Sequence, residues 1–372
     1  MSRKFGKKNI IKVDPLAYNL GLIGIGGIGK TTLAKNVCEK LVGEDGYIIA
    51  DVGREDGVDA IAGAVYEKIP DWETFDEFTM DIIENKTTDY KDLKVIVWDT
   101  IGELIRIAKP EVISQYNRDQ LKKGNSKKVN TINGAWGGFG NGEIFLIDML
   151  IERLWELRRV GVAMFLIGHT KPRTQSDPMT GEEFDILTTD LQYNYFNALK
   201  TKLHILGVAS IDRNIVKEKT GKTDFKGKDI IKGRVVGESR TITFRDDNYG
   251  VDSKSRFSEI VESIPLDADE FIKAIENAIK AEHEKGNTGK SIEESKKEQE
   301  VEKNKKVELE SKKINEEKEL NDINNKIKQF IIDSKKDMEI LTPLLTKTKE
   351  LGLVKPTDIT DINIARELVK VI

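Results

Sequence analysis

An eight-residue glycine-rich segment, Gly24–Thr31, constrains the fold of this chain more than any other feature. It reads G-I-G-G-I-G-K-T and lies between an apolar run, Tyr18–Ile23, and a segment with helical spacing, Thr32–Leu41. Glycines allow backbone conformations that are closed to other residues, so consecutive N–H groups can converge on one anion. A following helix presents its positive N-terminal end to the same point. The segment therefore predicts a phosphate-binding loop between a buried strand and a helix.

The polar residues of this loop have the chemistry that a nucleoside triphosphate requires. Lys30 supplies a mobile cation for the β- and γ-phosphates, and the Thr31 hydroxyl can ligate Mg²⁺. The residues expected to bind the nucleotide are Gly24, Gly26, Gly27, Gly29, Lys30, Thr31 and Thr32. We therefore expect ATP and Mg²⁺ as cofactors, with Thr31 as one of the metal ligands.

A second apolar run ends in a carboxylate about 70 residues after the loop. Val95–Asp99 reads V-I-V-W-D, which is the arrangement expected for the aspartate that organises Mg²⁺. Strand-ending aspartates are common, but one that follows a phosphate-binding loop at this spacing is a strong indication of an ATPase. The next residue is Thr100, where AAA+ ATPases usually carry a catalytic glutamate. The base that activates water must therefore lie elsewhere.

Two glutamates are candidates for that base, and one histidine is a candidate sensor of the γ-phosphate. Glu55 lies just past the second apolar strand, and Glu73 lies at the start of a predicted helix, where it could equally serve only to favour the helix N-terminus. A base must reach the attacking water, so the choice between them depends on a distance. His169 lies at the end of another apolar strand and could hydrogen-bond the terminal phosphate; alternatively, backbone groups satisfy it.

The order of apolar runs along residues 18–281 indicates an α/β fold. Short apolar strands separated by helical segments, as far as about residue 203, predict a mainly parallel sheet covered on both faces. The runs 204–209, 230–236 and 241–244 are separated by polar segments and predict an antiparallel extension of that sheet.

Composition divides the chain into three parts. Lys and Glu dominate residues 282–329, which predicts a charged helical linker, with a coiled-coil interaction surface as the alternative. Apolar residues return in 330–372, as expected for a small helical tail module. We therefore expect an ATPase domain over 1–281, a linker over 282–329 and a tail module over 330–372.

Composition also excludes several classes of protein. No stretch of about 18 apolar residues is present, and the basic N-terminus lacks the apolar run of a signal peptide. The single cysteine fits a reducing cytoplasm, and three histidines offer no cluster for zinc. We expect a soluble cytoplasmic protein with no membrane contact. Because the net charge is −4, any DNA binding must come from local patches.

With these residues in place, residues 15–281 resemble the RecA-like P-loop proteins of phage recombination modules, the Sak-four group. The motifs that carry the resemblance are, in order, GIGGIGKTT, the helix that starts at Trp72, VIVWDT, GAWGGFGNG, LIGHT and YGVDSKSRF. The resemblance implies an ATPase that binds single-stranded DNA in the host cytoplasm and assists strand annealing or exchange. It also implies a single-strand DNA-binding protein as a partner, and it implies nothing for residues 282–372.

Three segments are candidates for DNA contact. The first, residues 121–142, has the lysines and aromatic rings that suit single strands, namely Lys122, Lys123, Lys127, Lys128, Trp136 and Phe139. The second, 171–190, is predicted to be a loop after the strand that ends at His169 and has mixed charge, and the third, 217–234, is basic. For each of them an ordinary solvated surface is the alternative.

Sites of this type often lie between subunits, where a neighbouring subunit supplies a cation. We therefore expect self-association, with Arg245, Lys254 and Arg256 as candidate cations. A nucleotide-gated adaptor that presents residues 282–372 to a replication or packaging partner is the alternative function. A partitioning ATPase of the ParA type would carry lysine at the position of Ile25, which argues against that class.

Overall fold

The computed structural model describes residues 6, 9–54, 57–177, 179–223, 229–246, 250–286, 289–334, 337–357 and 359–372, and it describes no side chains within 214–236. Contacts divide the chain into two units, one formed by 1–79 with 92–302 and the other by 80–91 with 303–372.

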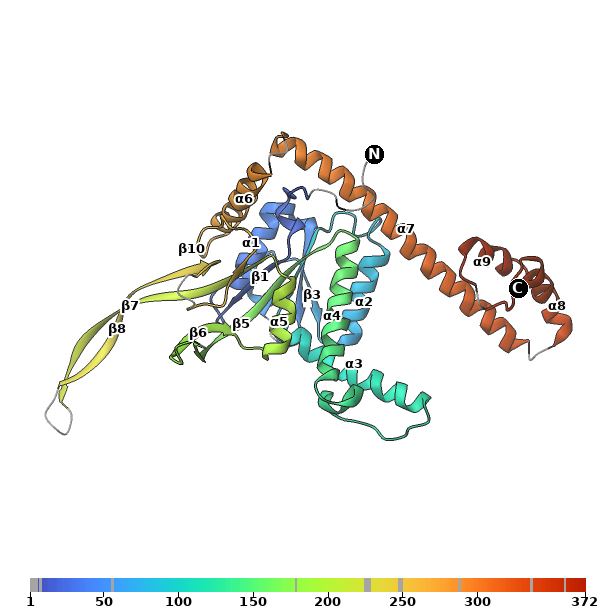
Figure 1. Cartoon of the computed structure of the whole chain (residues 1–372), viewed down its shortest axis with the longest axis horizontal. Helices are drawn as coiled ribbons and strands as arrows, with labels where there is room; N and C mark the ends of the chain where they lie inside the picture. Colours follow the sequence, from blue (N-terminus) through green and yellow to red (C-terminus); the bar gives the residue numbers. More distant parts are fainter. Residues whose placement is uncertain are drawn as a thin grey trace. The chain divides into compact units, whose positions relative to one another are not determined.

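Ten strands of the described residues belong to one sheet (Figure 1). The strands are β1 Leu20–Gly24, β2 Tyr47–Val52, β3 Tyr66–Ile69, β4 Val95–Asp99, β5 Ala163–Ser176, β6 Glu183–Thr189, β7 Ile205–Thr223, β8 Asp229–Thr243, β9 Lys254–Ser255 and β10 Ser263–Pro265. The order is β10-β8-β7-β1-β5-β4-β2-β3, with β6 paired to β5 and β9 to β7. Strands β7, β1, β5, β4, β2 and β3 are parallel, whereas β8, β10, β9 and β6 pair antiparallel. The predicted RecA-like α/β fold, a mainly parallel sheet with an antiparallel extension, is confirmed.

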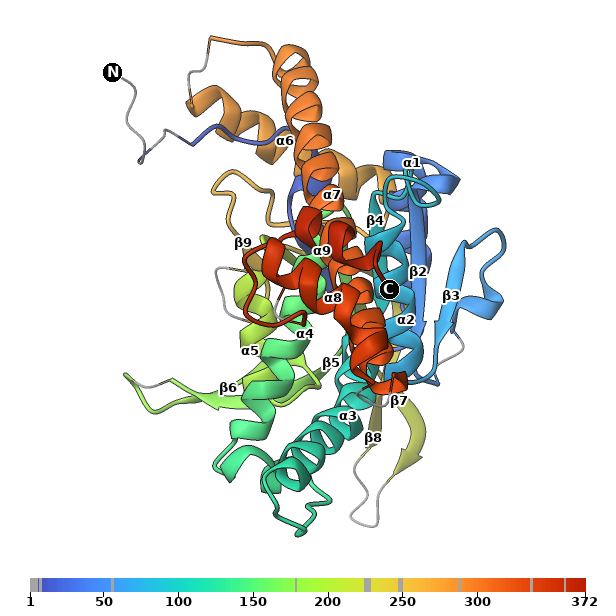
Figure 2. The ribbon, with the colours of Figure 1, turned by 90° about the vertical axis from the view of Figure 1, so that its right-hand side faces the viewer.

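Helices cover both faces of this sheet (Figure 2). The helices of the first unit are α1 Lys30–Val42, α3 Ile101–Lys122, α4 Asn141–Arg159, α5 Tyr193–Lys202, α6 Ala268–Lys285, α2 Trp72–Glu84 as far as Thr79 and α7 Ile292–Asp333 as far as Glu302. Side chains alternate along a strand, so Val95 and Val97 of β4 pack in one core with α1 and α6. Trp98 points the other way, and its ring lies 5.4 Å from that of Phe75 on α2.

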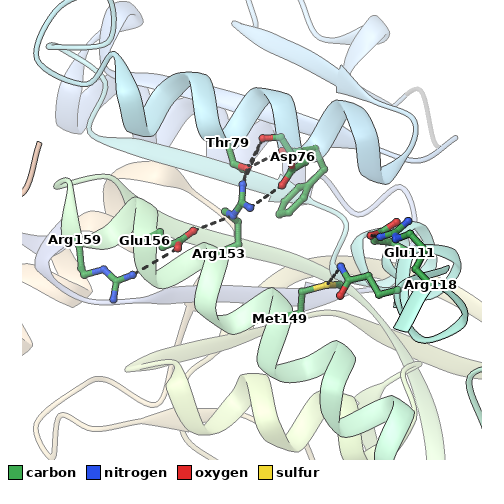
Figure 3. Close-up of polar contacts among 10 residues, drawn as sticks. Asp76, Thr79, Glu111, Arg118, Met149, Arg153, Glu156 and Arg159 are labelled. Carbon is green, nitrogen blue, oxygen red and sulfur yellow. Dashed lines mark hydrogen bonds and ion pairs between the residues drawn. The ribbon is translucent and has the colours of Figure 1, made fainter. Parts of the chain in front are cut away.

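One arginine joins helices α2 and α4, which cover the face of the sheet opposite α1 and α6. Arg153 of α4 donates from Nη1 to Thr79 Oγ1 of α2 at 2.9 Å, and its Nη2 lies 2.7 Å from Asp76 Oδ1 (Figure 3). The same guanidinium forms an ion pair with Glu156 of α4, with 3.0 Å between Nε and Oε2. Because Arg153 is mostly buried, this network fixes the register between α4 and the first half of α2.

The edge of the sheet opposite the glycine-rich loop contains a histidine among cations. The backbone N–H of Asn19 donates to His204 Nδ1 at 3.0 Å, immediately before β7. Burial, and then the charges of Arg256, Arg158, Lys254 and Lys12, lower the pKa of His204 to about 4. The folded protein therefore favours the neutral imidazole, which can accept the bond from Asn19.

This depressed pKa predicts a loss of stability in mild acid. In the unfolded chain His204 takes up a proton near pH 6.5, but in the folded protein it does so only near pH 4. Neutral His204 therefore contributes fully to the stability of the fold above about pH 6.5, and this contribution is lost as the pH falls towards 4. Because the ring is partly solvated, we expect the free energy of unfolding to fall by about 1 kcal/mol more between pH 7 and pH 5 than in His204→Gln. Urea titrations of both proteins at the two pH values measure the difference. Equal falls in the two proteins would contradict the assignment.

The second unit has its own small core, formed by the end of α7 together with α8 Met338–Glu350 and α9 Ile362–Val369. The buried residues of this core are Ile323, Ile327, Leu344, Ile359, Ala365 and Leu368. Ile323 and Ile327 lie within 282–329, so the last turns of α7 supply one wall of the core. None of the described helices has the combination of length and apolarity needed to cross a bilayer.

Candidate nucleotide-binding site

The glycine-rich loop connects the end of β1 to the first residue of α1, as the sequence predicts. Gly27 and Gly29 have φ of +74° and +108°, in the region that only glycine enters without strain. Gly24 is required for a different reason, because a Cβ there would lie 3.0 Å from Ala209 O on β7. The loop conformation therefore depends on glycine for backbone freedom at two positions and for close strand packing at a third.

Lys30 is the first residue of α1, and its side chain folds back into the loop. Its Nζ donates to Gly24 O and Ile25 O at 3.0 Å each and lies 3.4 Å from His169 Nδ1. Only 6% of the residue is exposed. The ammonium group is thus already held at the centre of the loop, where it can reach an anion without a large change of position.

Thr31 and Asp99 form the second part of the site. Thr31 Oγ1 donates to Asp99 Oδ2 at 2.5 Å, which joins the first turn of α1 to the tip of β4. Mg²⁺ in such sites is usually bound by one or two protein oxygens, with water and substrate phosphates completing the shell. No group of three or more acidic, histidine or cysteine residues in the described part of the chain could hold a metal by itself. A hydroxyl and a carboxylate at this distance fit a Mg²⁺ ion that arrives with its nucleotide.

Asp51, at the end of β2, is a site residue that the sequence interpretation did not include. β2 lies next to β4, and Asp51 is in register with Asp99. Tyr47 and Ile49 share a core with Val95 and Val97, so alternation places both aspartates on the α1 face. Asp51 is only 6% exposed. The signal was present in the sequence, because the run 47–50 ends in aspartate as 95–98 does.

The two candidate bases lie in different situations. Glu73 is exposed in the first turn of α2, which follows β3, and the strand order places β2 between β3 and β4. At about 4.8 Å between neighbouring strands, the ends of β3 and β4 are roughly 10 Å apart. Glu55 lies outside the described residues. Asp51 is the carboxylate that the sheet brings next to Asp99.

His169 lies in β5 directly opposite Gly24 of β1. This explains its approach to Lys30. Beyond His169 the chain does not form the loop predicted for 171–190, because β5 continues to Ser176 and pairs with β6 as a hairpin. Thr174 Oγ1 donates to Asp185 Oδ1 at 2.7 Å across this hairpin. One of the acidic side chains of 171–190 is therefore hydrogen-bonded within the hairpin.

A cavity of about 310 Å³ lies beside the loop, on the side of β8 and α6. Its lining mixes apolar and polar groups: Ile28, Gly29, Thr32, Leu33, Asn36, Arg240, Leu266, Asp267 and Ala268. Arg240 closes one side and donates from Nη1 to Ile28 O at 3.1 Å. The volume and the lining suit a base and ribose next to a phosphate loop. Residues 240 and 266–268 carry no local motif, and only the folded sheet brings them to α1.

The cations expected to act on a neighbouring subunit are bonded within the chain. Lys254 Nζ donates to Lys200 O at 2.6 Å and Arg256 Nη2 to Thr201 O at 2.8 Å, so both hold the last turn of α5. Because β9 pairs with the first residues of β7, they lie at the sheet edge opposite Gly24. Arg245 donates to Ser258 O at 3.2 Å.

Residues 121–142, here called the basic segment, connect α3 to α4 and extend beyond the sheet (Figure 1). Lys122, Lys123, Lys127 and Lys128 are all exposed. The two aromatic residues differ. Trp136 stacks on Phe145 with 4.2 Å between the ring centroids, whereas Phe139 is fully exposed. The side chains of the third basic run, 217–234, lie outside the described residues.

Comparisons with known proteins found a family model and a solved structure that are similar to this chain. The crystal structure of the flagellar accessory protein FlaH from Methanocaldococcus jannaschii is similar at 9% identity and a TM-score of 0.26, covering 66% of this chain and 91% of that chain. No protein with a curated description matches the sequence. A family model described as an AAA domain matches residues 17–257, which is more than half of the chain and includes the loop, Asp51, Asp99 and His169. The chain therefore belongs to the AAA domain family and is a nucleotide-binding P-loop ATPase.

Proposed function

We propose that this ATPase hydrolyses ATP with Mg²⁺ while it is bound to single-stranded DNA, and that it serves strand annealing or exchange in phage-type recombination. One element carries the proposal. Helix α3 begins at the tip of β4, where Thr100 caps it next to Asp99, and it ends at Lys122 in the basic segment. Its 22 residues span about 33 Å. A single helix therefore connects the nucleotide site to the surface proposed to bind DNA.

The proposed roles in the nucleotide site follow from the contacts above. Loop N–H groups and Lys30 bind the β- and γ-phosphates, while Thr31 and Asp99 hold Mg²⁺, which when bound neutralises charge on the phosphate oxygens. The adjacent cavity takes the base and ribose. Asp51 is proposed to orient the attacking water, ahead of Glu73 and Glu55, because it is buried beside Asp99.

The basic segment is proposed to hold the DNA backbone. It contains four lysines and no aspartate or glutamate. Lys123 pairs with Asp119 at 2.6 Å, but Lys122, Lys127 and Lys128 form no ion pair with any described residue. Their charge is therefore available to phosphates. His169, between Lys30 and the β5–β6 hairpin, is proposed to sense the γ-phosphate and to transmit its loss to that hairpin.

The test is ATP hydrolysis without DNA, with single-stranded DNA and with duplex DNA, beside a binding titration at 50 and 200 mM salt. We expect single strands to stimulate turnover most. If four phosphates are neutralised, the affinity should fall about 50-fold between the two salt concentrations. Absence of binding at 50 mM salt would remove DNA from the proposal and leave the ATPase assignment in place.

A nucleotide-gated adaptor is the second candidate, because the unit formed by 80–91 and 303–372 has a core of its own that could bind a replication or packaging partner. ATP binding without measurable hydrolysis would favour this candidate. Self-association and a single-strand DNA-binding protein as partner belong to the first proposal. Sedimentation with and without ATP tests self-association.

A further inference from the structure

Five consecutive residues of the basic segment have positive φ angles. They are Trp136, Gly137, Gly138, Phe139 and Gly140, with φ of +56°, +90°, +77°, +52° and +83°. Glycine adopts such angles without a steric penalty, but phenylalanine does not. Phe139 also gains nothing from packing, since the residue is fully exposed. The turn therefore holds an aromatic ring in water at a conformational cost to the backbone.

Packed residues fix both ends of this turn. Trp136 stacks on Phe145 of α4 at 4.2 Å and meets Tyr116 of α3 edge-on at 5.6 Å. Asn141 Nδ2, at the start of α4, donates to Trp136 O at 3.2 Å. At Gly142 a Cβ would lie 2.2 Å from Ile132 O, so α4 begins in direct contact with the preceding 3-10 turn, Ile132–Gly137. The packed residues on either side of the turn therefore hold Phe139 in position.

Hydrogen bonds and packing connect two of the lysines to the same packed residues. Asn117 of α3 clamps Val129 with two bonds, from Nδ2 to Val129 O at 3.0 Å and from Val129 N to Oδ1 at 2.9 Å. A Cβ on Gly134 would touch the Val129 side chain at 3.4 Å. Lys127 and Lys128 directly precede Val129. They are therefore connected to the same packed residues as the turn that carries Phe139.

An exposed flat apolar ring on the same segment as cations that form no ion pair with a described residue fits a ligand that is a polyanion carrying flat apolar groups. We propose that Phe139 stacks on a base of single-stranded nucleic acid whose phosphates lie along Lys122, Lys127 and Lys128, while Trp136 only supports the turn. The inference rests on the proposed function and assigns its recognition to one side chain. Because every base has a π face, the contact is indifferent to sequence.

The experiment uses the full chain and an oligothymidylate that contains one 2-aminopurine. Bound wild-type protein should quench the 2-aminopurine, since stacking on an aromatic ring does so. Phe139→Ala should abolish the quenching and weaken binding about 5- to 150-fold, with an unchanged slope against salt because the lysines remain. Phe139→Trp should restore both signals. Val354→Ala is the matched control, because Val354 is 94% exposed and lies outside the three candidate DNA segments, so its loss should not change DNA binding.

Each outcome separates this inference from the proposed function. Wild-type affinity and quenching in Phe139→Ala overturn the stacking role and leave DNA-stimulated hydrolysis standing. If the wild-type protein itself binds no single strand at low salt, the proposed function fails first. A third result, in which Phe139→Ala keeps its DNA affinity but loses self-association in sedimentation, assigns the ring to a contact between copies of the chain and also overturns the inference.

Discussion

Lys30→Ala should lower the turnover number for ATP hydrolysis roughly 10²- to 10³-fold, the usual effect of removing one preorganised charge from a transition state. The Lys30 ammonium is buried at the centre of the loop, held by Gly24 O and Ile25 O. No other described cation is hydrogen-bonded to these two carbonyls. Steady-state phosphate release at saturating ATP and Mg²⁺ measures the loss.

The matched control is Lys40→Ala, at the other end of α1. Lys40 forms an exposed ion pair with Asp269 at 2.7 Å, which contributes little to stability. We expect Lys40→Ala to hydrolyse ATP at the wild-type rate. Both variants should show cooperative unfolding in urea, because the helix and the sheet are unchanged. Wild-type turnover in Lys30→Ala, with the fold intact, would remove the loop from catalysis.

Asp99→Asn should also lower turnover by roughly 10²-fold or more, but through the metal. An asparagine oxygen can still accept the bond from Thr31, so the junction between α1 and β4 remains, while the charge that holds Mg²⁺ is lost. ATP binding measured by calorimetry without Mg²⁺ should be equal or tighter, since a negative charge near the triphosphate has been removed. Titration of the hydrolysis rate with Mg²⁺ should show a raised midpoint.

Asp51→Asn provides the comparison for this variant. If Asp51 orients water rather than metal, its loss should lower turnover without moving the Mg²⁺ midpoint. A shifted midpoint in Asp51→Asn would instead place Asp51 among the residues that hold the ion. An unshifted midpoint in Asp99→Asn would contradict the metal role of Asp99.

The parts of the site that the sequence predicts are those encoded by neighbours along the chain. Residues 24–31 predict their loop because glycine spacing and the flanking periodicity are local, and Asp99 follows from the buried run before it. Asp51 needed the pairing of β2 with β4, since nothing local places it opposite Asp99. The cavity beside Ile28 could not be predicted, because Arg240 reaches it from more than 200 residues away.

The hairpin formed by β5 and β6 and the exposure of Phe139 show a second limit. Residues 171–190 have the polar composition of a loop, but pairing across the turn lets their backbone groups satisfy each other, and composition does not record pairing. Trp136 and Phe139 are both aromatic residues in a glycine-rich stretch, yet one is packed and the other is fully exposed. Only the path of the backbone decides between the two.

The position of β1 has a mechanical consequence. Its neighbours on either side, β5 and β7, both continue past the edge where the phosphate loop lies, one towards β6 and the other towards β8. Beyond that edge, each of the two strands stays hydrogen-bonded to its antiparallel partner. On the function proposed above, we expect a change at the phosphate loop on hydrolysis to be transmitted along both strands to two separate parts of the surface.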